Sequence, residues 1–320
     1  MNINNLSAMK NIPDGFYIGI DSGGTKCELL ITDTENKILY SKLFKGVHFS
    51  IAGNKIYSDY ISEYIKSSLK EIKLNIKTCL AIGIGAAGAR EEKDRNVLKN
   101  SFEKKLKHNN ILVTTDAMTA LHGAFEGREG IILISGTGSV LYGYTKGKVI
   151  RVGGWGRVIG DEGSGYWIGK RALNLIMKEY DSRLNKKSLI TEKLLEIYGI
   201  DNRNINEKIF HHNFEIQRLA PLVIESAENN CSVSLQIVNE AVAFLTDHIK
   251  TYLKVSGRKK TTEIAFIGSI IENRNILSER LKKEIKKLKI IKVVEKKHSS
   301  SFGAILLAKE KNHIAKRKIN

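Results

Sequence analysis

The sequence predicts an α/β protein of two related lobes, each a mixed β-sheet with helices on its faces. Two runs, residues 16–45 and 130–154, both read as strand, glycine-containing turn, strand, turn, strand. The stretches IDSGGT (20–25) and ISGTGS (134–139) hold the same place in the two runs. We interpret this correspondence as an internal duplication of one lobe, with each three-strand meander extended by further strands and helices.

The first lobe is predicted over residues 1–124, and a C-terminal helix over 299–320 could complete it. After the strand Phe16–Asp21 and its glycine turn, the apolar spacing alternates between strand and helix patterns. The predicted strands are 29–33, 37–44, 79–85 and 110–116, and the predicted helices are 54–73, 95–107 and the segment after Asp116.

The second lobe is predicted over residues 125–298. Its meander is followed by a long helical insertion, 164–255, which few Gly or Pro residues interrupt. The pattern then resumes with a strand at 263–268, a helix at 274–288, a strand at 289–295 and a final helix from Ser299.

Composition indicates a soluble globular protein. The longest weakly polar run, 79–89, is shorter than the ~20 apolar residues of a membrane-spanning helix. The leader Met1–Pro13 has no apolar core typical of a secretory signal, so we expect a cytoplasmic protein. The cysteines Cys27, Cys79 and Cys231 lie far apart in the sequence, a spacing that predicts buried thiols and not a zinc or disulfide framework.

The formal net charge of +18 favours anionic partners. Nucleic acid is one class, but much of the excess is lysine in helix-like segments such as 278–297, where a solvated helix face explains it. No basic-aromatic strand motif or helix-turn-helix segment accompanies the charge. We therefore expect no nucleic-acid partner, and anionic small molecules such as ATP.

The two glycine turns suggest a phosphate-binding function. A glycine turn between strands lets backbone N–H groups point into one concavity, although an ordinary hairpin explains a single such turn equally well. Here two turns match, each with hydroxyls predicted at its tip: Ser22 and Thr25, then Thr137 and Ser139. Asp21 would lie near the phosphates, so we expect a hydrated Mg²⁺ ion between them.

These patterns together resemble a known superfamily. The segments GIDSGGTKCELLITD, TTDA, LISGTGS, GGWGRVIGDEGSGYWIG, FIGSI and HSSSFGA recur in the expected order from Ile18 to Ala304. They resemble the sugar kinase, actin and Hsp70 superfamily, and within it the N-acetylglucosamine kinase group and its BadF/BadG/BcrA/BcrD relatives. The resemblance implies a two-lobed actin-like (ribonuclease H-like) fold around a nucleotide cleft, with ATP and Mg²⁺ as cofactors.

The resemblance also implies roles for individual residues. Asp116 would be the catalytic general base and would touch the sugar, and Asp21 would belong to the metal site. The implied ATP-binding residues are Ser22, Gly23, Gly24, Thr25, Lys26, Gly136, Thr137, Gly138, Ala220, Gly268, Ser269 and Asn273. The implied sugar-binding residues, besides Asp116, are Ser139, Val140, Gly154, Trp155, Gly156 and Asp161.

Several of these residues also have a purely structural interpretation. Asp116 precedes a predicted helix and could equally be its N-cap. Asp161 can accept bonds from sugar hydroxyls, whereas Glu162 and Ser164 are expected to cap the helix that begins near Ser164. Trp167 on that helix is expected to belong to the core.

One segment departs from the pattern of the resembling family. The family has an Asn after the first meander that contacts the sugar, whereas this chain has GVHFSIAGN at residues 46–54. His48 and Ser50 are the candidate substitutes, and Asn54 falls at the start of the next predicted helix.

The leading functional prediction is an ATP-dependent kinase that phosphorylates the 6-hydroxyl of an amino sugar. N-acetylglucosamine is the first candidate, glucosamine and N-acetylmuramic acid the next, and a homodimer is expected. The alternatives are an ATPase activator of a radical dehydratase, which needs cysteines in the matching loops, and a sugar-responsive regulator, which needs a DNA-binding segment before Phe16. No cysteine lies in the matching loops, and the short stretch before Phe16 leads us to expect no such regulator.

Overall fold

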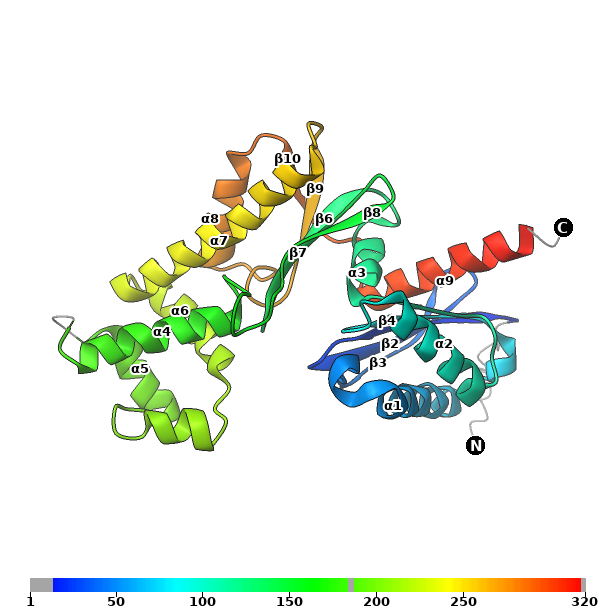
Figure 1. The fold of residues 1–320 in the computed structure, drawn as a ribbon, viewed down its shortest axis with the longest axis horizontal. Helices are drawn as coiled ribbons and strands as arrows, with labels where there is room; N and C mark the ends of the chain where they lie inside the picture. The colour runs from blue at the N-terminus through cyan, green and yellow to red at the C-terminus, as the bar shows by residue number, and fades with distance from the viewer. Residues whose placement is uncertain (1–13, 184–186, 318–320) are drawn as a thin grey trace, which may run out of the picture. The chain divides into compact units, whose positions relative to one another are not determined.

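A computed structural model describes residues 14–183 and 187–317 of the chain, without the side chains beyond residue 312 (Figure 1). The prediction that Met1–Pro13 contains no secretory signal concerns residues that the structure does not describe. The chain divides into two compact units. The first comprises the residues up to Arg128 together with those from Lys296 onward, and the second comprises Glu129–Glu295.

The first unit contains a five-stranded mixed sheet in the order β3-β2-β1-β4-β5. The first three strands form the predicted antiparallel meander, and β4 and β5 run parallel to β1. Its elements are β1 (Phe16–Ser22), β2 (Lys26–Asp33), β3 (Ile38–Lys45), α1 (Phe49–Glu71), η1 (Ile76–Thr78), β4 (Cys79–Ala86), α2 (Glu92–Leu106), β5 (Ile111–Thr114), α3 (Asp116–Phe125) and α9 (Ser300–Arg317).

The second unit repeats this topology, with the sheet order β10-β9-β6-β7-β8. Strands β6, β7 and β8 correspond to β1, β2 and β3, and β9 and β10 correspond to β4 and β5, with the same strand directions. The duplication inferred from the two glycine turns is thereby confirmed. The elements are β6 (Gly130–Ser135), β7 (Ser139–Thr145), β8 (Lys148–Gly153), α4 (Gly165–Tyr180), α5 (Leu189–Tyr198), η2 (Glu207–His211), η3 (Ile216–Arg218), α6 (Leu219–Glu228), α7 (Ser232–Ser256), β9 (Thr262–Ile267), α8 (Ile276–Lys286) and β10 (Ile291–Val294).

The two faces of the first sheet pack against different helices. Alternate residues of β1, such as Phe16 and Ile18, join the larger core together with residues of α1 and α2. Tyr17, on the opposite face, packs with residues of α9. Helix α9 approaches the sheet closely at Gly19 and Gly83, where an added Cβ would lie 2.0 Å from a carbonyl oxygen of that helix. Glycine at these two positions therefore lets the C-terminal helix pack directly on β1 and β4.

The observed helix α1 begins earlier in the sequence than the predicted helix 54–73. Helical structure begins at Phe49, but Gly53 has φ 71° and ψ 170°, so the segment consists of one short turn and then a long helix. The loop after the first meander is consequently shorter than the sequence indicated.

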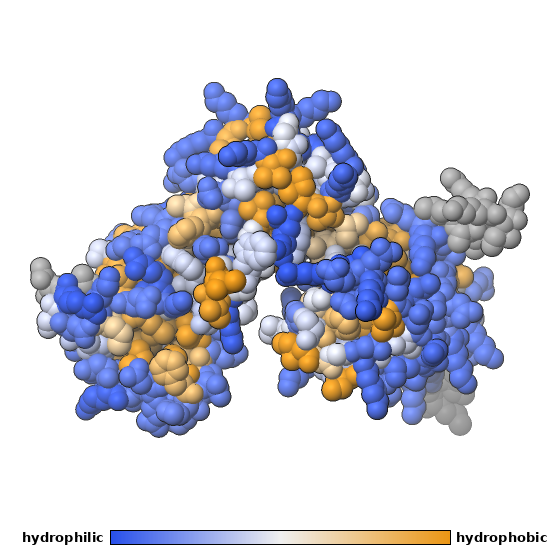
Figure 2. All heavy atoms as spheres, viewed as in Figure 1, coloured by the Kyte–Doolittle hydropathy of each residue, from blue (hydrophilic) through white to orange (hydrophobic). Residues whose placement is uncertain are grey.

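The insertion in the second unit forms a helical layer with its own contribution to the core. Buried residues of α4, α6 and α7 join residues of β6 and β9 in one large apolar cluster. On α8, Leu277, Leu281 and Ile285 face this core, whereas Lys283 and Lys286 are exposed. The lysine-rich segment is thus an amphipathic helix with a solvated face, and Figure 2 shows a predominantly hydrophilic visible surface.

Among the helices in the described ranges, none is both long enough and apolar enough to cross a bilayer.

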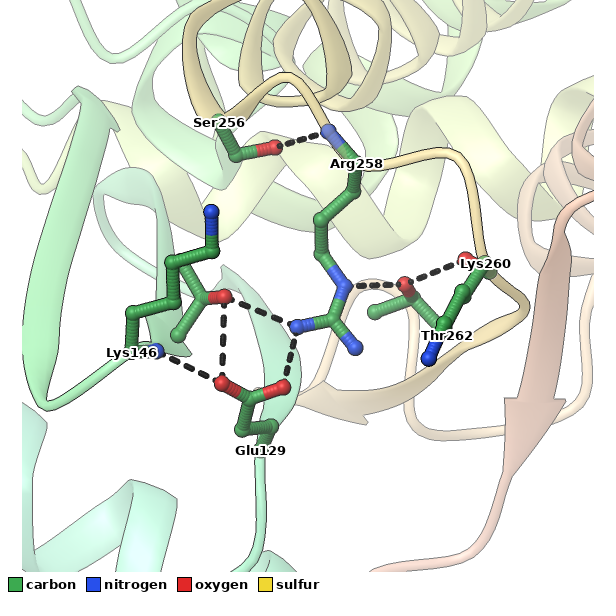
Figure 3. Close-up of polar contacts among 7 residues, drawn as sticks. Glu129, Lys146, Ser256, Arg258, Lys260 and Thr262 are labelled. Atoms are coloured by element: carbon green, nitrogen blue, oxygen red, sulfur yellow. Dashed lines mark hydrogen bonds and ion pairs between the residues drawn. The ribbon is translucent and has the colours of Figure 1, made fainter.

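A polar network pins the start of β6 to the end of β7 and to the connection between α7 and β9 (Figure 3). The Arg258 guanidinium donates to Thr262 Oγ1 (2.9 Å), to Thr145 Oγ1 (2.8 Å) and to the Glu129 carboxylate. The backbone N–H of Lys146 donates to Glu129 at 2.6 Å. This N–H, followed by Arg258, lowers the pKa of Glu129 to about 2.

Removing the guanidinium should therefore destabilise the second unit. We expect Arg258→Gln to lower its free energy of unfolding by about 1–2 kcal/mol at pH 7, because hydrogen bonds to a charged partner are lost at a partly exposed site. Urea denaturation followed by circular dichroism measures the change. Lys259→Gln removes the same charge from an exposed neighbour and should leave the midpoint unmoved. Equal midpoints for the Arg258 variant and wild type would contradict the role of the network.

The same network predicts an acid dependence. Because the pKa of Glu129 is lower in the folded chain than its ordinary value of 4.5, its ionised form contributes stability above that value. The contribution should be lost as the pH falls from about 4.5 towards about 2. Glu129→Gln should accordingly be less stable than wild type at pH 7, and the difference should shrink across that window.

Candidate functional site

The first cluster of candidate residues lies at the carboxyl edge of the first sheet. Strands β1, β4 and β5 are parallel, so their carboxyl ends meet along one edge, the usual place for ligands in such sheets. Asp21 lies at the end of β1, and Asp116 follows β5 as the first residue of α3. We call Asp21, His48, Ser50, Arg90 and Asp116 the Asp116 cluster.

Asp116 is not the N-cap of its helix. Thr115 occupies the cap position, and its Oγ1 accepts a hydrogen bond from the N–H of Met118 at 3.3 Å. The Asp116 carboxylate accepts from the N–H of Ala117 at 3.0 Å. Since Thr115 supplies the cap that the sequence also allowed for Asp116, the half-buried carboxylate is not needed for capping.

The electrostatics of the cluster couple its two carboxylates. Burial raises the pKa of Asp21 to about 7, and the nearby negative charges of Asp116 and Glu28 add to this effect. Burial also raises the pKa of Asp116, while the Ala117 N–H and the charges of His48 and Arg90 act against the rise. A desolvated carboxylate that other negative charges act on favours binding a proton or a cation.

The turn between β1 and β2 exposes its backbone and the side chain of Thr25. The N–H of Gly23 donates to Lys26 O at 3.0 Å, and Gly24, Thr25 and Lys26 are exposed. Ser22, by contrast, is fully buried, and its Oγ donates to Val47 O at 3.2 Å. The prediction that the Ser22 hydroxyl lies at the tip is wrong, because strand pairing continues through Ser22 and turns its side chain inward.

The second cluster lies at the corresponding edge of the second sheet. Gly165 N–H donates to Gly136 O at 2.7 Å, and Tyr166 N–H donates to Thr137 O at 3.2 Å. The glycine turn between β6 and β7 therefore rests on the first residues of α4. Its Thr137 is exposed, whereas Ser139 is buried and its Oγ donates to Glu162 O at 2.6 Å. The Ser139 hydroxyl, like that of Ser22, is wrongly predicted at a turn tip.

Asp161 lies against this turn. Its Oδ1 accepts from the N–H of Gly156 at 3.0 Å, and its Oδ2 lies 2.7 Å from where a Cβ on Gly138 would be. The side chain is buried, and the backbone has a φ of 57°, a conformation that Asp and Asn adopt more readily than most residues. We call Gly136–Ser139, Gly154–Gly156 and Asp161 the Asp161 cluster.

The loop between β8 and α4 exposes an aromatic ring. Trp155 is 66% exposed, and the guanidinium carbon of Arg151 lies 4.3 Å from the centre of its ring, so one face of the indole is covered by a cation. Val140, also predicted at the sugar site, contacts the backbone at Gly154, where an added Cβ would lie 2.7 Å from Val140 Cγ2.

At the start of α4, the structural roles predicted for Ser164 and Trp167 are confirmed, and the role predicted for Glu162 is not. Ser164 is the N-cap and accepts from the N–H of Trp167 at 3.1 Å. Trp167 packs edge-to-face on Phe244, as expected for a core residue. Glu162 was expected to share in capping, but its carboxylate instead lies 3.9 Å from His248 Nε2.

The residues predicted to hold adenosine are partly brought together. Gly268, with φ 100°, lies against the glycine turn, 3.9 Å from the Cβ position of Gly136. Ser269 is exposed, and the side-chain amide of Asn273 donates to Ser269 O at 3.3 Å. Ala220 is fully buried in the apolar core on α6, so its side chain is not presented to a ligand.

Sequence reasoning missed two side chains that approach the clusters. His248, in the middle of α7, lies 2.8 Å from the Cβ position of Gly153, and burial lowers its pKa. Arg90, after β4, acts on Asp116 through its charge. Neither residue belongs to a local motif, so only the fold could have revealed them.

The Asp116 cluster offers carboxylates to a metal ion but does not surround one point with ligands. Among the described residues, no three His, Cys, Asp or Glu side chains gather around one point. Asp21, whose raised pKa reflects burial and carboxylate crowding, fits a cation held through water and phosphate oxygens, as Mg²⁺ commonly is.

The duplicated mixed sheets with glycine turns define an actin-like ATPase fold. Consistent with this, a structure of a candidate N-acetylglucosamine kinase from Chromobacterium violaceum matches 92% of the chain and 100% of its own with a TM-score of 0.71 at 24% identity. A glucokinase of the ROK family from Streptomyces griseus, solved with glucose and AMPPNP, matches 92% of the chain and 100% of its own with a TM-score of 0.59 at 17% identity.

The chain belongs to the BadF/BadG/BcrA/BcrD ATPase family, which it matches over residues 18–308. It is 32% identical to the N-acetylmuramic acid/N-acetylglucosamine kinase of Clostridium acetobutylicum, over 92% of the chain and 98% of that protein. It is 29% identical to the N-acetyl-D-glucosamine kinase of Dictyostelium discoideum, over 91% and 97%.

Proposed function

We propose that this protein is an ATP-dependent kinase that transfers a phosphoryl group to the 6-hydroxyl of an amino sugar of the N-acetylglucosamine type. The observation that carries the proposal is the position of Asp116, half-buried, at the same carboxyl edge of the sheet as Asp21 and free of the capping role. The two sugar kinases to which the chain is similar over more than nine-tenths of its length support the same class of reaction.

Phosphoryl transfer depends on positioning and charge neutralisation more than on covalent chemistry. Asp116 would accept the proton of the attacking hydroxyl, since its pKa is raised towards the working range of a general base. Backbone N–H groups of the two glycine turns would bind phosphate oxygens, and Asp161 would bind sugar hydroxyls. A Mg²⁺ ion held near Asp21 would supply neutralisation of phosphate charge.

The alternative of a radical-dehydratase activator is less well supported. Such an activator needs thiolates to ligate an iron–sulfur cluster. The cysteines Cys27, Cys79 and Cys231 are all buried, and burial raises the pKa of both Cys27 and Cys79 to about 12. The Cys27 and Cys79 thiols are therefore held in the protonated form, and all three side chains are enclosed, which does not favour cluster ligation.

A coupled assay of ADP release against a panel of hexosamines tests the proposal. N-acetylglucosamine, N-acetylmuramic acid, glucosamine and glucose would be compared at saturating ATP, and the product of the best substrate examined for a 6-phosphate. Turnover with no amino sugar, or a phosphate on another hydroxyl, would contradict it.

Asp21→Asn should weaken Mg²⁺-dependent turnover more than sugar binding. We expect the Mg²⁺ concentration for half-maximal turnover to rise by roughly 10–100-fold, the range typical when an outer partner of a metal site is removed. Glu28→Gln removes a neighbouring carboxylate that accepts from Ser301 Oγ, and it is the matched control. A magnesium dependence equal to that of wild type would exclude Asp21 from the metal site.

A further inference from the structure

Three lysine-rich segments of the second unit meet at the amino edge of its sheet. They are the turn 145–149 that joins β7 to β8, the end of α7 with the loop after it, 254–261, and the turn 287–290 between α8 and β10. Because β6, β9 and β10 are parallel, this edge lies opposite the glycine turn between β6 and β7. We call the three segments together the basic edge.

Hydrogen bonds hold the three segments next to one another. The Arg258 guanidinium donates to Thr145 Oγ1 at 2.8 Å and to Thr262 Oγ1 at 2.9 Å, which joins the loop after α7 to the turn after β7. Thr262 N–H donates to Ile290 O at 2.8 Å, which joins the start of β9 to the turn after α8. The basic edge is therefore one continuous surface, although its segments are far apart in the sequence.

The basic edge carries ammonium groups that no acidic side chain neutralises. Figure 3 shows Lys146 and Lys260 flanking Arg258. The nearby acids are already engaged, since Glu129 accepts from Arg258 and from the Lys146 N–H, and Glu263 has interactions of its own. Within the described part of the chain, six exposed lysines of the basic edge have side chains without an ion pair or hydrogen bond: Lys146, Lys148, Lys254, Lys259, Lys260 and Lys289.

Two exposed apolar side chains lie among these lysines. Val255, in the last turn of α7, is 64% exposed, and Val149, the second residue of β8, is 39% exposed. Lysines with exposed aliphatic side chains between them suit an anionic lipid surface. There the ammonium groups stay at the level of the lipid phosphates and the apolar groups enter the interface.

Nucleic acid fits the basic edge less well. Proteins that bind nucleic acids commonly use the guanidinium fork of arginine on phosphates and aromatic rings that stack on bases. The three segments contain no aromatic residue. Their one arginine, Arg258, is committed to Glu129, Thr145 and Thr262.

We propose that the basic edge binds the surface of a membrane that contains anionic lipids, with no segment of the second unit crossing the bilayer. The Asp161 cluster lies at the opposite edge of the same sheet, about 20 Å away along the six residues of β6. Binding at the basic edge thus leaves the glycine turn of this unit uncovered. The inference does not depend on the proposed kinase function, because lipid binding needs neither ATP nor a sugar.

Sedimentation of the full chain with vesicles tests the proposal. The vesicles would contain phosphatidylcholine alone, or equal parts of phosphatidylcholine and phosphatidylglycerol. Binding would be measured at about 0.1 M and about 1 M salt, where the Debye length is about 10 Å and about 3 Å. A triple variant, Lys146→Gln with Lys259→Gln and Lys260→Gln, removes one ammonium group from the turn after β7 and two from the loop after α7.

A second triple variant is the matched control. Lys66→Gln, Lys93→Gln and Lys104→Gln remove the same charge from exposed positions on α1 and α2. Both triple variants change only exposed side chains, so their urea midpoints should equal that of wild type. The two variants have the same net charge, and only the first one alters the basic edge.

We expect wild type to bind the anionic vesicles at least about tenfold more tightly than the neutral ones, and to lose this preference at high salt. The basic-edge variant should lose at least about tenfold in affinity, since each lysine near an anionic surface contributes about a factor of five. The control should stay close to wild type, because charges more than about 10 Å from the lipid surface are screened at about 0.1 M salt.

Val255→Ser distinguishes lipid from other polyanions. It keeps every charge and removes apolar contact at a position that is 64% exposed, so the fold should be unaffected. We expect vesicle binding to weaken about threefold or more, because the valine no longer enters the interface. Binding of a single-stranded DNA oligonucleotide, measured in parallel, should not change.

Three results would overturn the proposal. The first is wild-type binding to neutral and anionic vesicles alike, or to neither. The second is an equal loss of affinity in the two triple variants, because the net charge of the chain would then explain the binding. The third is oligonucleotide binding that the basic-edge variant abolishes, without vesicle binding, which would assign the basic edge to nucleic acid. Vesicle binding without phosphorylation of any amino sugar would instead contradict only the proposed reaction.

Discussion

Asp116→Asn is expected to lower kcat for the amino sugar by ~10²–10⁴-fold, the usual contribution of a general base. The amide keeps an oxygen that can accept the Ala117 N–H, so the local backbone should be unchanged. Removing a carboxylate whose pKa burial raises should not destabilise the fold. The coupled assay measures the loss of kcat, and thermal melting and nucleotide calorimetry check that fold and ATP binding persist.

Thr115→Ala provides the matched control for the Asp116 variant. It removes the actual N-cap of α3 and should cost about 1 kcal/mol of stability with little effect on kcat. If the Asp116 variant kept near wild-type kcat while Thr115→Ala lost activity, the catalytic assignment would fail and the segment would matter only through the helix start.

Asp161→Asn should raise KM for the amino sugar by roughly 10–100-fold and leave KM for ATP close to that of wild type. An amide has one acceptor oxygen in place of two, so a sugar hydroxyl paired with Oδ2 would be left poorly bonded, at about 1–3 kcal/mol. Asn suits the backbone at φ 57° and can still accept from Gly156 N–H, so the loop should hold its conformation. Steady-state kinetics with each substrate varied in turn gives both constants.

The Glu162→Gln variant is the control that distinguishes this effect from a general loss of negative charge in the loop. Glu162→Gln alters the same loop, but the Glu162 side chain faces His248 and not the glycine turn. We expect its sugar KM to stay near that of wild type. A rise in both variants to the same extent would mean that the loop, and not the Asp161 carboxylate, determines KM.

Much of the fold could be predicted because its signals are local or repeated. The apolar run at the start of Phe16–Asp21 and the matching glycine turns identify the strands, and the repeated pattern predicts the duplication that the two strand orders confirm. The long helix after Gly53 follows from apolar residues at helical spacing, such as Tyr57, Ile61 and Ile65, which are fully buried.

The sequence by itself determined the order of the elements, the duplicated topology and the turn and helix-start positions that candidate residues occupy. Only the tertiary structure decided how their side chains are used. The hydroxyls of Ser22 and Ser139 bond to carbonyls 25 and 23 residues away, and His48 and Arg90 act on Asp116 from segments remote in the sequence. The spacing of apolar residues that marks a helix or a strand can be recognised from neighbours along the chain. The partner of a polar side chain depends instead on which distant segment packs beside it.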